Sequence, residues 1–194
     1  MVDALALTTM TAGRTGDPDG TLAERAARGD RSAFAEIVAA HQARVARLAH
    51  RLLGWSHEVE DVVQDVFVAA LEHLPRFRGD SSLATWLTAI AVNKCRSARR
   101  RRLLRLRFAS PGPGRAGRDA GEAPDSGLLR RERHRRVRRA VRGLPRRLRE
   151  VVVLRYLEEM PIEQIAKVLS ISPGAVGSRL HRARLRLAAD LSEG

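Results

Sequence analysis

Residues 59–74, VEDVVQDVFVAALEHL, carry the apolar pattern that most constrains the fold of this chain. Apolar side chains recur there at intervals of three and four residues, which places them on one side of an α-helix. The pattern therefore predicts a helix packed against other helices. The positions expected to face inward are Val59, Val62, Val63, Val66, Phe67, Ala70, Leu71 and Leu74.

The opposite side of this helix is acidic, although the chain as a whole has a formal net charge of +14. Asp61, Gln64, Asp65 and Glu72 lie on that side, and two further glutamates precede it. Acids near a helix start are favoured by the helix dipole, so a simple solvated face explains them. A docking surface for a basic protein partner is the alternative interpretation, and the residues alone leave both open.

The positive charge comes almost wholly from arginine, since Lys94 and Lys167 are the only lysines. Arginine binds phosphate through two parallel hydrogen bonds and stays charged in every environment. A charge of this size predicts binding to a polyanion, with an affinity that falls as the salt concentration rises. A GC-rich genome also enriches arginine, so composition alone does not identify the partner.

Several classes of function find no support in the sequence. A single cysteine, Cys95, excludes an intramolecular disulfide and a cysteine-based zinc cluster, and the six histidines form no ligand spacing, so we expect no metal or cofactor. There is no convergent nucleophile, carboxylate pair or phosphate loop, so we expect neither an enzyme nor a small-molecule substrate. No apolar run approaches the ~20 residues of a membrane span, and the start lacks a secretion signal, which predicts a cytoplasmic protein.

Helical patterns and breakers predict an all-α fold of two small helical domains. Residues 1–20 are expected to be a disordered leader, and residues 21–107 a compact domain of three or four helices. Residues 108–127, rich in Gly, Pro and Ser, are expected to be a flexible linker. Residues 128–194 are expected to form a second, four-helix domain.

Two segments have patterns typical of nucleic-acid binding. Residues 76–82, RFRGDSS, combine an aromatic side chain with arginines just before a helix that ends in a basic run, which suits single-stranded nucleic acid. Near the C-terminus, a short helix that starts at Pro161 is followed by a turn, then by Ser172 as an N-cap and Pro173 at the first position of a basic helix. This pattern predicts a helix-turn-helix, although a plain helical hairpin has the same spacing.

Three stretches together resemble one protein family. DVVQDVF (61–67) is similar to the motif D-x-x-Q-[DE]-x-F, and residues 77–100 are similar to F-x-G-x-s-x-x-x-W-L-x-x-I-A-x-N. Residues 144–187 resemble a C-terminal domain that ends in S-R-L-x-R-A-R. The family is that of the extracytoplasmic-function (ECF) sigma factors of bacterial RNA polymerase, and the resemblance covers residues 32–107 and 128–189.

The resemblance implies roles for individual residues. Docking on the β′ clamp helices of core RNA polymerase, with the β subunit as a further contact, is implied for Asp61, Gln64 and Asp65. Contact with the −10 promoter element, including capture of a flipped base, is implied for Arg76, Phe77, Arg78, Asp80, Ser82, Asn93, Lys94, Arg96, Arg99 and Arg100. Contact with the −35 element is implied for Ser172, Gly174, Ala175, Ser178, Arg179, His181, Arg182 and Arg184. For Trp86, which lies on the inward side of its helix, a core position is favoured over base stacking.

The chain departs from the family motif in the helix-turn-helix that is expected to read the −35 element. Ala175 stands where the family usually has threonine, Gly177 where it has lysine, and Ser170 where it has the glycine of the turn. We therefore expect −35 contacts to depend on Arg179, Arg182 and the helix N-terminal dipole.

The expected function is that of a sigma factor, which binds core RNA polymerase, reads −35 as duplex and captures −10 as an opened strand. The resemblance also implies an anti-sigma factor as an inhibitory partner. One alternative is a helix-turn-helix regulator that binds operator DNA without polymerase, which leaves the acidic helix unexplained. Another is a generic arginine-rich nucleoid or RNA-binding protein, which explains only the charge.

Overall fold

A computed structural model describes residues 18–54, 58–108 and 128–192, and within these ranges all regular secondary structure is helical. The predicted all-α fold is confirmed. The expected leader and linker lie outside the described residues, apart from residues 18–20 and residue 108, which are helical. None of the described helices combines the length and apolarity that a membrane span needs.

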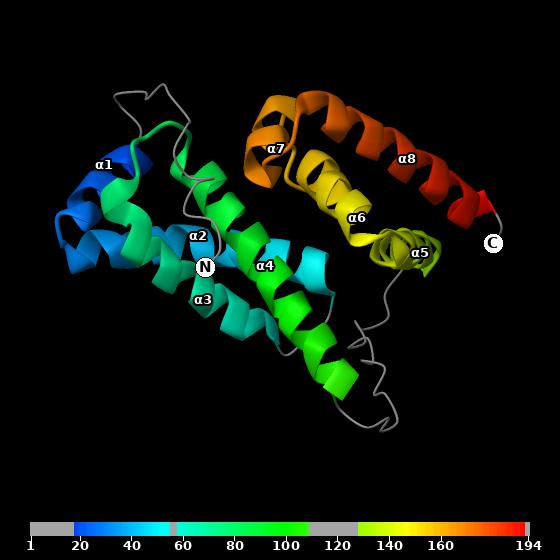
Figure 1. The fold of residues 1–194 in the computed structure, drawn as a ribbon, viewed down its shortest axis with the longest axis horizontal. Coiled ribbons are helices and arrows are strands. Elements are labelled where there is room, and N and C mark those ends of the chain that lie inside the picture. The colour runs from blue at the N-terminus through cyan, green and yellow to red at the C-terminus, as the bar shows by residue number, and fades with distance from the viewer. Residues whose placement is uncertain (1–17, 55–57, 109–127, 193–194) are drawn as a thin grey trace.

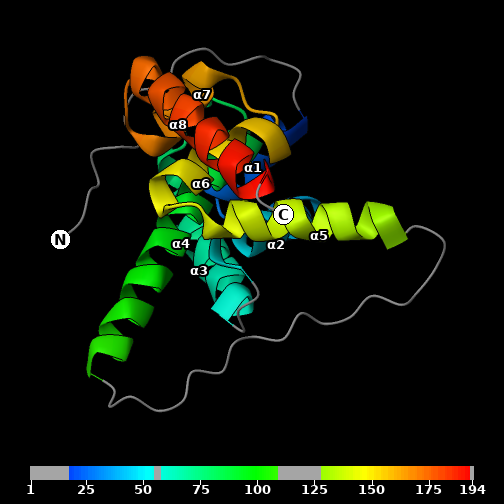
Figure 2. The same cartoon turned by 90° about the vertical axis from the view of Figure 1, so that its right-hand side faces the viewer.

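The N-terminal unit consists of helices that pack around one another (Figure 1). Its elements are α1 (Pro18–Ala27), α2 (Arg31–Leu53), α3 (Glu58–His73), the short 3₁₀ turn η2 (Leu74–Arg76) and α4 (Leu83–Phe108). Helices α2, α3 and α4 pack pairwise, and α1 lies against α2. Figures 1 and 2 both show the C-terminal end of α4 extending beyond the other helices. The 26 residues of α4 span about 39 Å.

Local signals in the sequence fix where these helices begin and end. The carboxylate of Asp30 accepts hydrogen bonds from the backbone N–H groups of Ser32 and Ala33 at 2.9 and 3.1 Å, which caps the start of α2. These bonds, Ala33 first, together with the Arg25 guanidinium, lower the pKa of Asp30. Gly54 ends α2 with φ 81°, a left-handed value that glycine adopts at little cost.

The C-terminal unit is built from α5 (Leu128–Gly143), α6 (Arg146–Val152), the π-helical turn η3 (Val153–Leu157), α7 (Ile162–Leu169) and α8 (Pro173–Ser192). Helix α8 packs along α6, α7 and α5 (Figure 2). The helix that starts after Pro145 widens in its second half into a π turn, which the sequence did not predict. Pro161 is the N-cap of α7 and not, as expected, its first helical residue; Pro173 does occupy the first position of α8.

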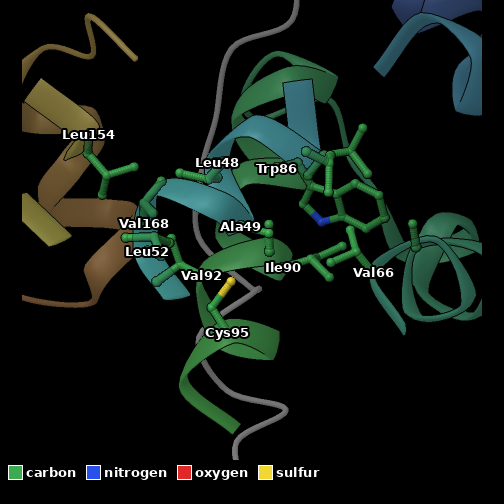
Figure 3. Close-up of a cluster of buried hydrophobic side chains, with 14 of the residues drawn as sticks. Leu48, Ala49, Leu52, Val66, Trp86, Ile90, Val92, Cys95, Leu154 and Val168 are labelled. Carbon is green, nitrogen blue, oxygen red and sulfur yellow. The ribbon is translucent and has the colours of Figure 1, made fainter. Parts of the chain in front are cut away.

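The hydrophobic core is continuous between the two units. Leu154 and Val168 of the C-terminal unit face Leu48, Leu52 and Val92 of the N-terminal unit (Figure 3). The core also includes aliphatic side chains of α3, among them Val62 and Val66, which are fully buried. The sequence did not predict that both units would share one core.

One predicted core position on α3 is wrong. Leu71 was expected to face inward, but it is 51% exposed. The buried positions in this part of α3 are taken by Ala69 and Ala70, and the next residue along the helix turns about 100° away from them. The other positions predicted to face inward are buried, apart from Val63, which is half-buried against the core.

The turn between α7 and α8 stores backbone strain that a single substitution should relieve. Ser170 ends α7 in the left-handed region, with φ 55° and ψ 51°, where a side chain costs about 1 kcal/mol or more and glycine costs least. Ser170→Gly should therefore raise the free energy of unfolding by about 0.5–1 kcal/mol in urea titrations. Ser178→Gly, within α8, should instead lower the free energy of unfolding. A loss of stability in Ser170→Gly would contradict the conclusion that Ser170 is strained in the left-handed region.

Candidate polymerase and nucleic-acid interface

The predicted docking residues form one stripe along α3. Asp61 and Gln64 are exposed, and Asp65 is half-exposed. Spacings of three and four residues bring their side chains together on the helix surface. Arg101 of α4 lies 3.4 Å from an oxygen of Asp65, and Arg105 pairs with Glu58 at the start of the helix. Such exposed ion pairs contribute little to stability, so Asp65 can exchange Arg101 for another cation.

Two exposed apolar residues extend the same stripe, although the sequence pattern placed one of them, Leu71, in the core. Val68 and Leu71 are 57% and 51% exposed, and they follow Asp61 and Gln64 by two turns of α3. Exposed aliphatic side chains beside acidic ones suit contact with another protein. The signal was present in the sequence, because Val68 follows Asp61 by seven residues and so shares its side.

The loop of residues 76–82 presents cations ahead of α4. Arg76, Arg78 and Ser82 are exposed, and Asp80 is half-buried. Gly79 has φ 72°, so the loop makes a turn that favours glycine. The hydroxyl of Ser82 accepts a hydrogen bond from the backbone N–H of Thr85 at 3.2 Å, so Ser82 also caps α4.

The two aromatic residues of this region pack against each other. The ring centroids of Phe77 and Trp86 are 5.1 Å apart with an interplanar angle of 48°. Trp86 is only 7% exposed, which confirms the core position that was favoured for it. Phe77 is half-buried against the same core, so its ring anchors the loop to α4.

The basic side of α4 is partly engaged by the other unit. Asn93 and Arg100 are exposed, whereas Lys94, Arg96 and Arg99 are half-buried. The guanidinium of Arg96 donates from Nε and Nη2 to the two carboxylate oxygens of Glu150 on α6, at 3.1 and 2.8 Å. A predicted −10 contact is therefore bound within the protein in this structure.

Helix α8 presents the second basic surface. The hydroxyl of Ser172 accepts from the backbone N–H of Ala175 at 3.2 Å, so the predicted cap is present. Burial, followed by repulsion from Arg147, lowers the pKa of Arg179. The exposed residues among those predicted to contact −35 are Ser172, Gly174, Ser178, His181, Arg182 and Arg184, whereas Ala175 and Arg179 are half-buried. Across the described ranges, His, Cys, Asp and Glu form no group that could hold a metal ion.

Comparison with known proteins identifies the family. The model of Sigma-70 region 2 matches residues 37–104, and that of Sigma-70 region 4 matches residues 134–187. The ECF RNA polymerase sigma-E factor of Escherichia coli K12 is 36% identical over 183 residues, which cover 86% of this chain and 90% of that protein. The chain belongs to the ECF sigma factors. The RNA polymerase sigma-H factor of Pseudomonas aeruginosa is 34% identical over 184 residues, covering 88% of this sigma factor and 92% of the relative.

A solved structure shows the same fold. CnrH, determined in complex with the cytosolic domain of CnrY, superposes with a TM-score of 0.66 at 33% sequence identity, covering 91% of this sigma factor and 99% of CnrH. Sigma factors direct RNA polymerase to promoters, so promoter-specific transcription initiation is the function of this protein. Region 2 includes the α3 stripe and most of α4, and region 4 includes most of α8. Family membership thus favours a sigma factor over the stand-alone operator-binding regulator.

Proposed function

We propose that this sigma factor binds core RNA polymerase through the acidic and apolar stripe of α3, formed by Asp61, Gln64, Asp65, Val68 and Leu71. The main support for this proposal is that acidic and basic residues lie on separate exposed surfaces. One exposed stripe is acidic and apolar, whereas the exposed surfaces of α4 and α8 are arginine-rich. Because DNA repels the first surface and attracts the others, the protein can bind polymerase and promoter at the same time. The polymerase supplies the chemistry, and the sigma factor itself is not an enzyme.

For the −10 element, the loop of residues 76–82 and α4 are the proposed reading surface. Capture of a flipped base costs a few kcal/mol of unstacking, which contacts to the strand must offset. Arg76 and Arg78 are exposed on the loop and suit phosphate contacts, while Phe77 holds the loop against Trp86. Asn93, Lys94, Arg99 and Arg100 extend this surface along α4, toward the duplex side of the element.

For the −35 element, the N-terminal half of α8 is the proposed reading surface. In a helix-turn-helix, the first turns of the second helix approach the base edges in the major groove. Arg182 is exposed there, and only its Nε is used within the helix by this bond, as a donor to the Ser178 carbonyl at 3.3 Å. Region 2 and region 4 are proposed to act as two domains, joined through residues 109–127.

Replacing Arg182 tests this assignment. Arg182→Ala should lower transcription from a promoter with a −35 element by about 10-fold or more, because one base or phosphate contact of arginine contributes about 1–3 kcal/mol. The matched control is Arg135→Ala, which removes an exposed arginine from α5 and should leave transcription near the wild-type level. Equal losses in the two variants, measured by run-off transcription with saturating core polymerase, would contradict a specific role for Arg182.

The backbone at Gly177 has room for a side chain. A Cβ placed on Gly177 meets no atom within 4 Å, so alanine fits there without displacement. The same holds for Gly174. Gly177 therefore marks a place where this sigma factor lacks a side chain that could reach DNA, and not one where glycine is required by packing.

An anti-sigma factor is the further partner that we propose. CnrH, which shares this fold, was solved in complex with the cytosolic domain of another protein, CnrY. The exposed leucines at the end of α4, Leu103, Leu104 and Leu106, are suited to such a protein contact.

A further inference from the structure

The two units are held together by an interface that combines apolar packing with buried charges. Leu154 and Val168 pack on Leu48, Leu52 and Val92, as Figure 3 shows. Around this apolar centre lie two glutamates of the C-terminal unit, Glu150 and Glu158, whose side chains are each only 5% exposed. Carboxylates this deeply buried are rarely found without cations beside them.

The first glutamate is bound to the −10 surface. Both oxygens of Glu150 accept from Arg96 of α4, in the two-pronged geometry that gives the strongest pairs. Arg146, on the same helix as Glu150, lies 3.5 Å from one of these oxygens. The pair joins residues 54 positions apart in sequence and ties α6 to the middle of α4.

The second glutamate is bound to α2. One oxygen of Glu158 accepts from Nη1 of Arg51 at 2.7 Å, and the other accepts from Nε of Arg44 at 3.3 Å. Neither Arg44 nor Arg51 belongs to the proposed DNA-reading or polymerase-docking residues. Their arrangement around one buried carboxylate therefore serves contact between the units.

Each unit also caps a helix end of the other. Arg149 of α6 donates to the backbone carbonyl of Leu52 at 3.1 Å, at the C-terminal end of α2. In return, Arg51 of α2 donates to the carbonyl of Leu157 at 2.8 Å, at the end of η3. Unpaired carbonyls at helix ends favour cations, so each bond stabilises the closed arrangement.

This arrangement conflicts with simultaneous reading of two promoter elements. Elements centred near −35 and −10 are separated by roughly 80 Å of duplex at about 3.4 Å per base pair. In the structure, α4 packs directly on α7, and Arg96 of the −10 surface is close enough to Arg179 of the −35 surface to affect its pKa. Two surfaces that touch cannot contact sites so far apart.

We propose that Glu150, Glu158 and Arg149 form a latch that holds the free sigma factor closed, with Arg96 withheld from −10 DNA until the two units separate. The latch regulates the promoter-reading surfaces and so rests on the proposed function. The latch opens when a competitor binds its arginines or covers its apolar centre. The phosphates of promoter DNA are such competitors for the arginines. The closed state needs no second protein, because all of its contacts lie within this chain.

Cys95 is a native reporter for this latch. The thiol is buried on α4, and a small hollow beside it is lined by Arg96, Arg149 and Glu150. Burial, with a smaller contribution from the Glu150 carboxylate, raises the pKa of Cys95 to about 12. Since the thiolate is the reactive form, Cys95 should react very slowly while the units are closed and faster once α6 leaves α4.

The test compares Glu150→Gln/Glu158→Gln with wild type in the full-length protein. Glutamine keeps the volume of each side chain but removes the charge that binds Arg96, Arg44 and Arg51. The rate of Cys95 reaction with an aromatic disulfide at pH 8 should rise about 10-fold or more, and the radius of gyration from small-angle X-ray scattering should increase. The matched control is Glu36→Gln/Glu163→Gln, which removes two exposed glutamates from α2 and α7 and should change neither quantity.

Two results would overturn the latch. The first is a thiol rate and a radius of gyration in the double variant that equal those of the control. The second is a faster thiol rate accompanied by loss of the helical circular dichroism signal, which would mean that the units unfold and do not separate. Neither readout involves polymerase or DNA, so failure of the latch is distinguishable from failure of the proposed function, which would appear in transcription assays of wild type.

Discussion

Replacement of both Asp61 and Asp65 by arginine should reduce core-dependent transcription by about 100-fold or more. Both carboxylates lie on the surface of α3, in line with the exposed side chains of Val68 and Leu71. Loss of a charged contact at the centre of a protein interface costs about 2–5 kcal/mol, and each 1.4 kcal/mol is a factor of ten in affinity. Reversal of the charge adds repulsion from a basic partner to that loss.

The fold should survive this change, because neither side chain supports the core. Asp65 has one exposed ion pair, to Arg101, and exposed pairs contribute little. The control is Glu24→Arg/Glu36→Arg, which alters the net charge equally on exposed positions of α1 and α2. Wild-type affinity of the Asp61→Arg/Asp65→Arg variant for core polymerase, measured by fluorescence anisotropy, would show that the stripe is only a solvated face.

Trp86→Ala should destabilise the N-terminal unit by about 3–5 kcal/mol. The indole is 7% exposed and packs against Phe77, so its removal leaves a cavity and frees the loop that carries Arg76 and Arg78. Urea unfolding followed by circular dichroism measures the loss. Transcription should fall in parallel, because the loop loses its anchor on α4.

Trp86→Phe separates a core position from base stacking. A phenyl ring fills most of the same space, so this variant should lose no more than about 1.5 kcal/mol and keep most of its activity. A Trp86→Ala variant with wild-type stability but poor opening of −10 DNA would instead assign the indole to DNA. A coupling free energy between Phe77 and Trp86, from the double-mutant cycle, should also be measurable because the two rings touch.

Much of the fold follows from local sequence signals. The apolar spacing of residues 59–74 predicted α3, and Asp30, Ser82 and Ser172 each cap a helix where their residue types suggested. The helix-turn-helix was predictable from Pro161, Ser172 and the basic helix that follows. These features depend on residues within one turn of each other, so a sequence displays them directly.

The contacts that a sequence does not display are those between distant segments. Arg96 was assigned to DNA from its motif and its charge, and no local pattern indicates that Glu150, 54 residues later, binds it. The apolar spacing predicts Leu71 in the core. It does not tell which residue at the edge of an apolar stripe meets a neighbouring helix, and Leu71 meets none closely enough to be buried. The π turn at Val153–Leu157, which contacts α2 of the N-terminal unit, likewise has no local signal in the sequence.

Run-off transcription from a promoter library, with core RNA polymerase alone and with core plus this protein, tests whether the protein acts as a sigma factor. We expect transcripts from a defined promoter set only when both are present, and we expect the protein without core to select none of these promoters. Tight, sequence-specific binding by the protein alone, unchanged by core polymerase and by Asp61→Arg/Asp65→Arg, would contradict this expectation.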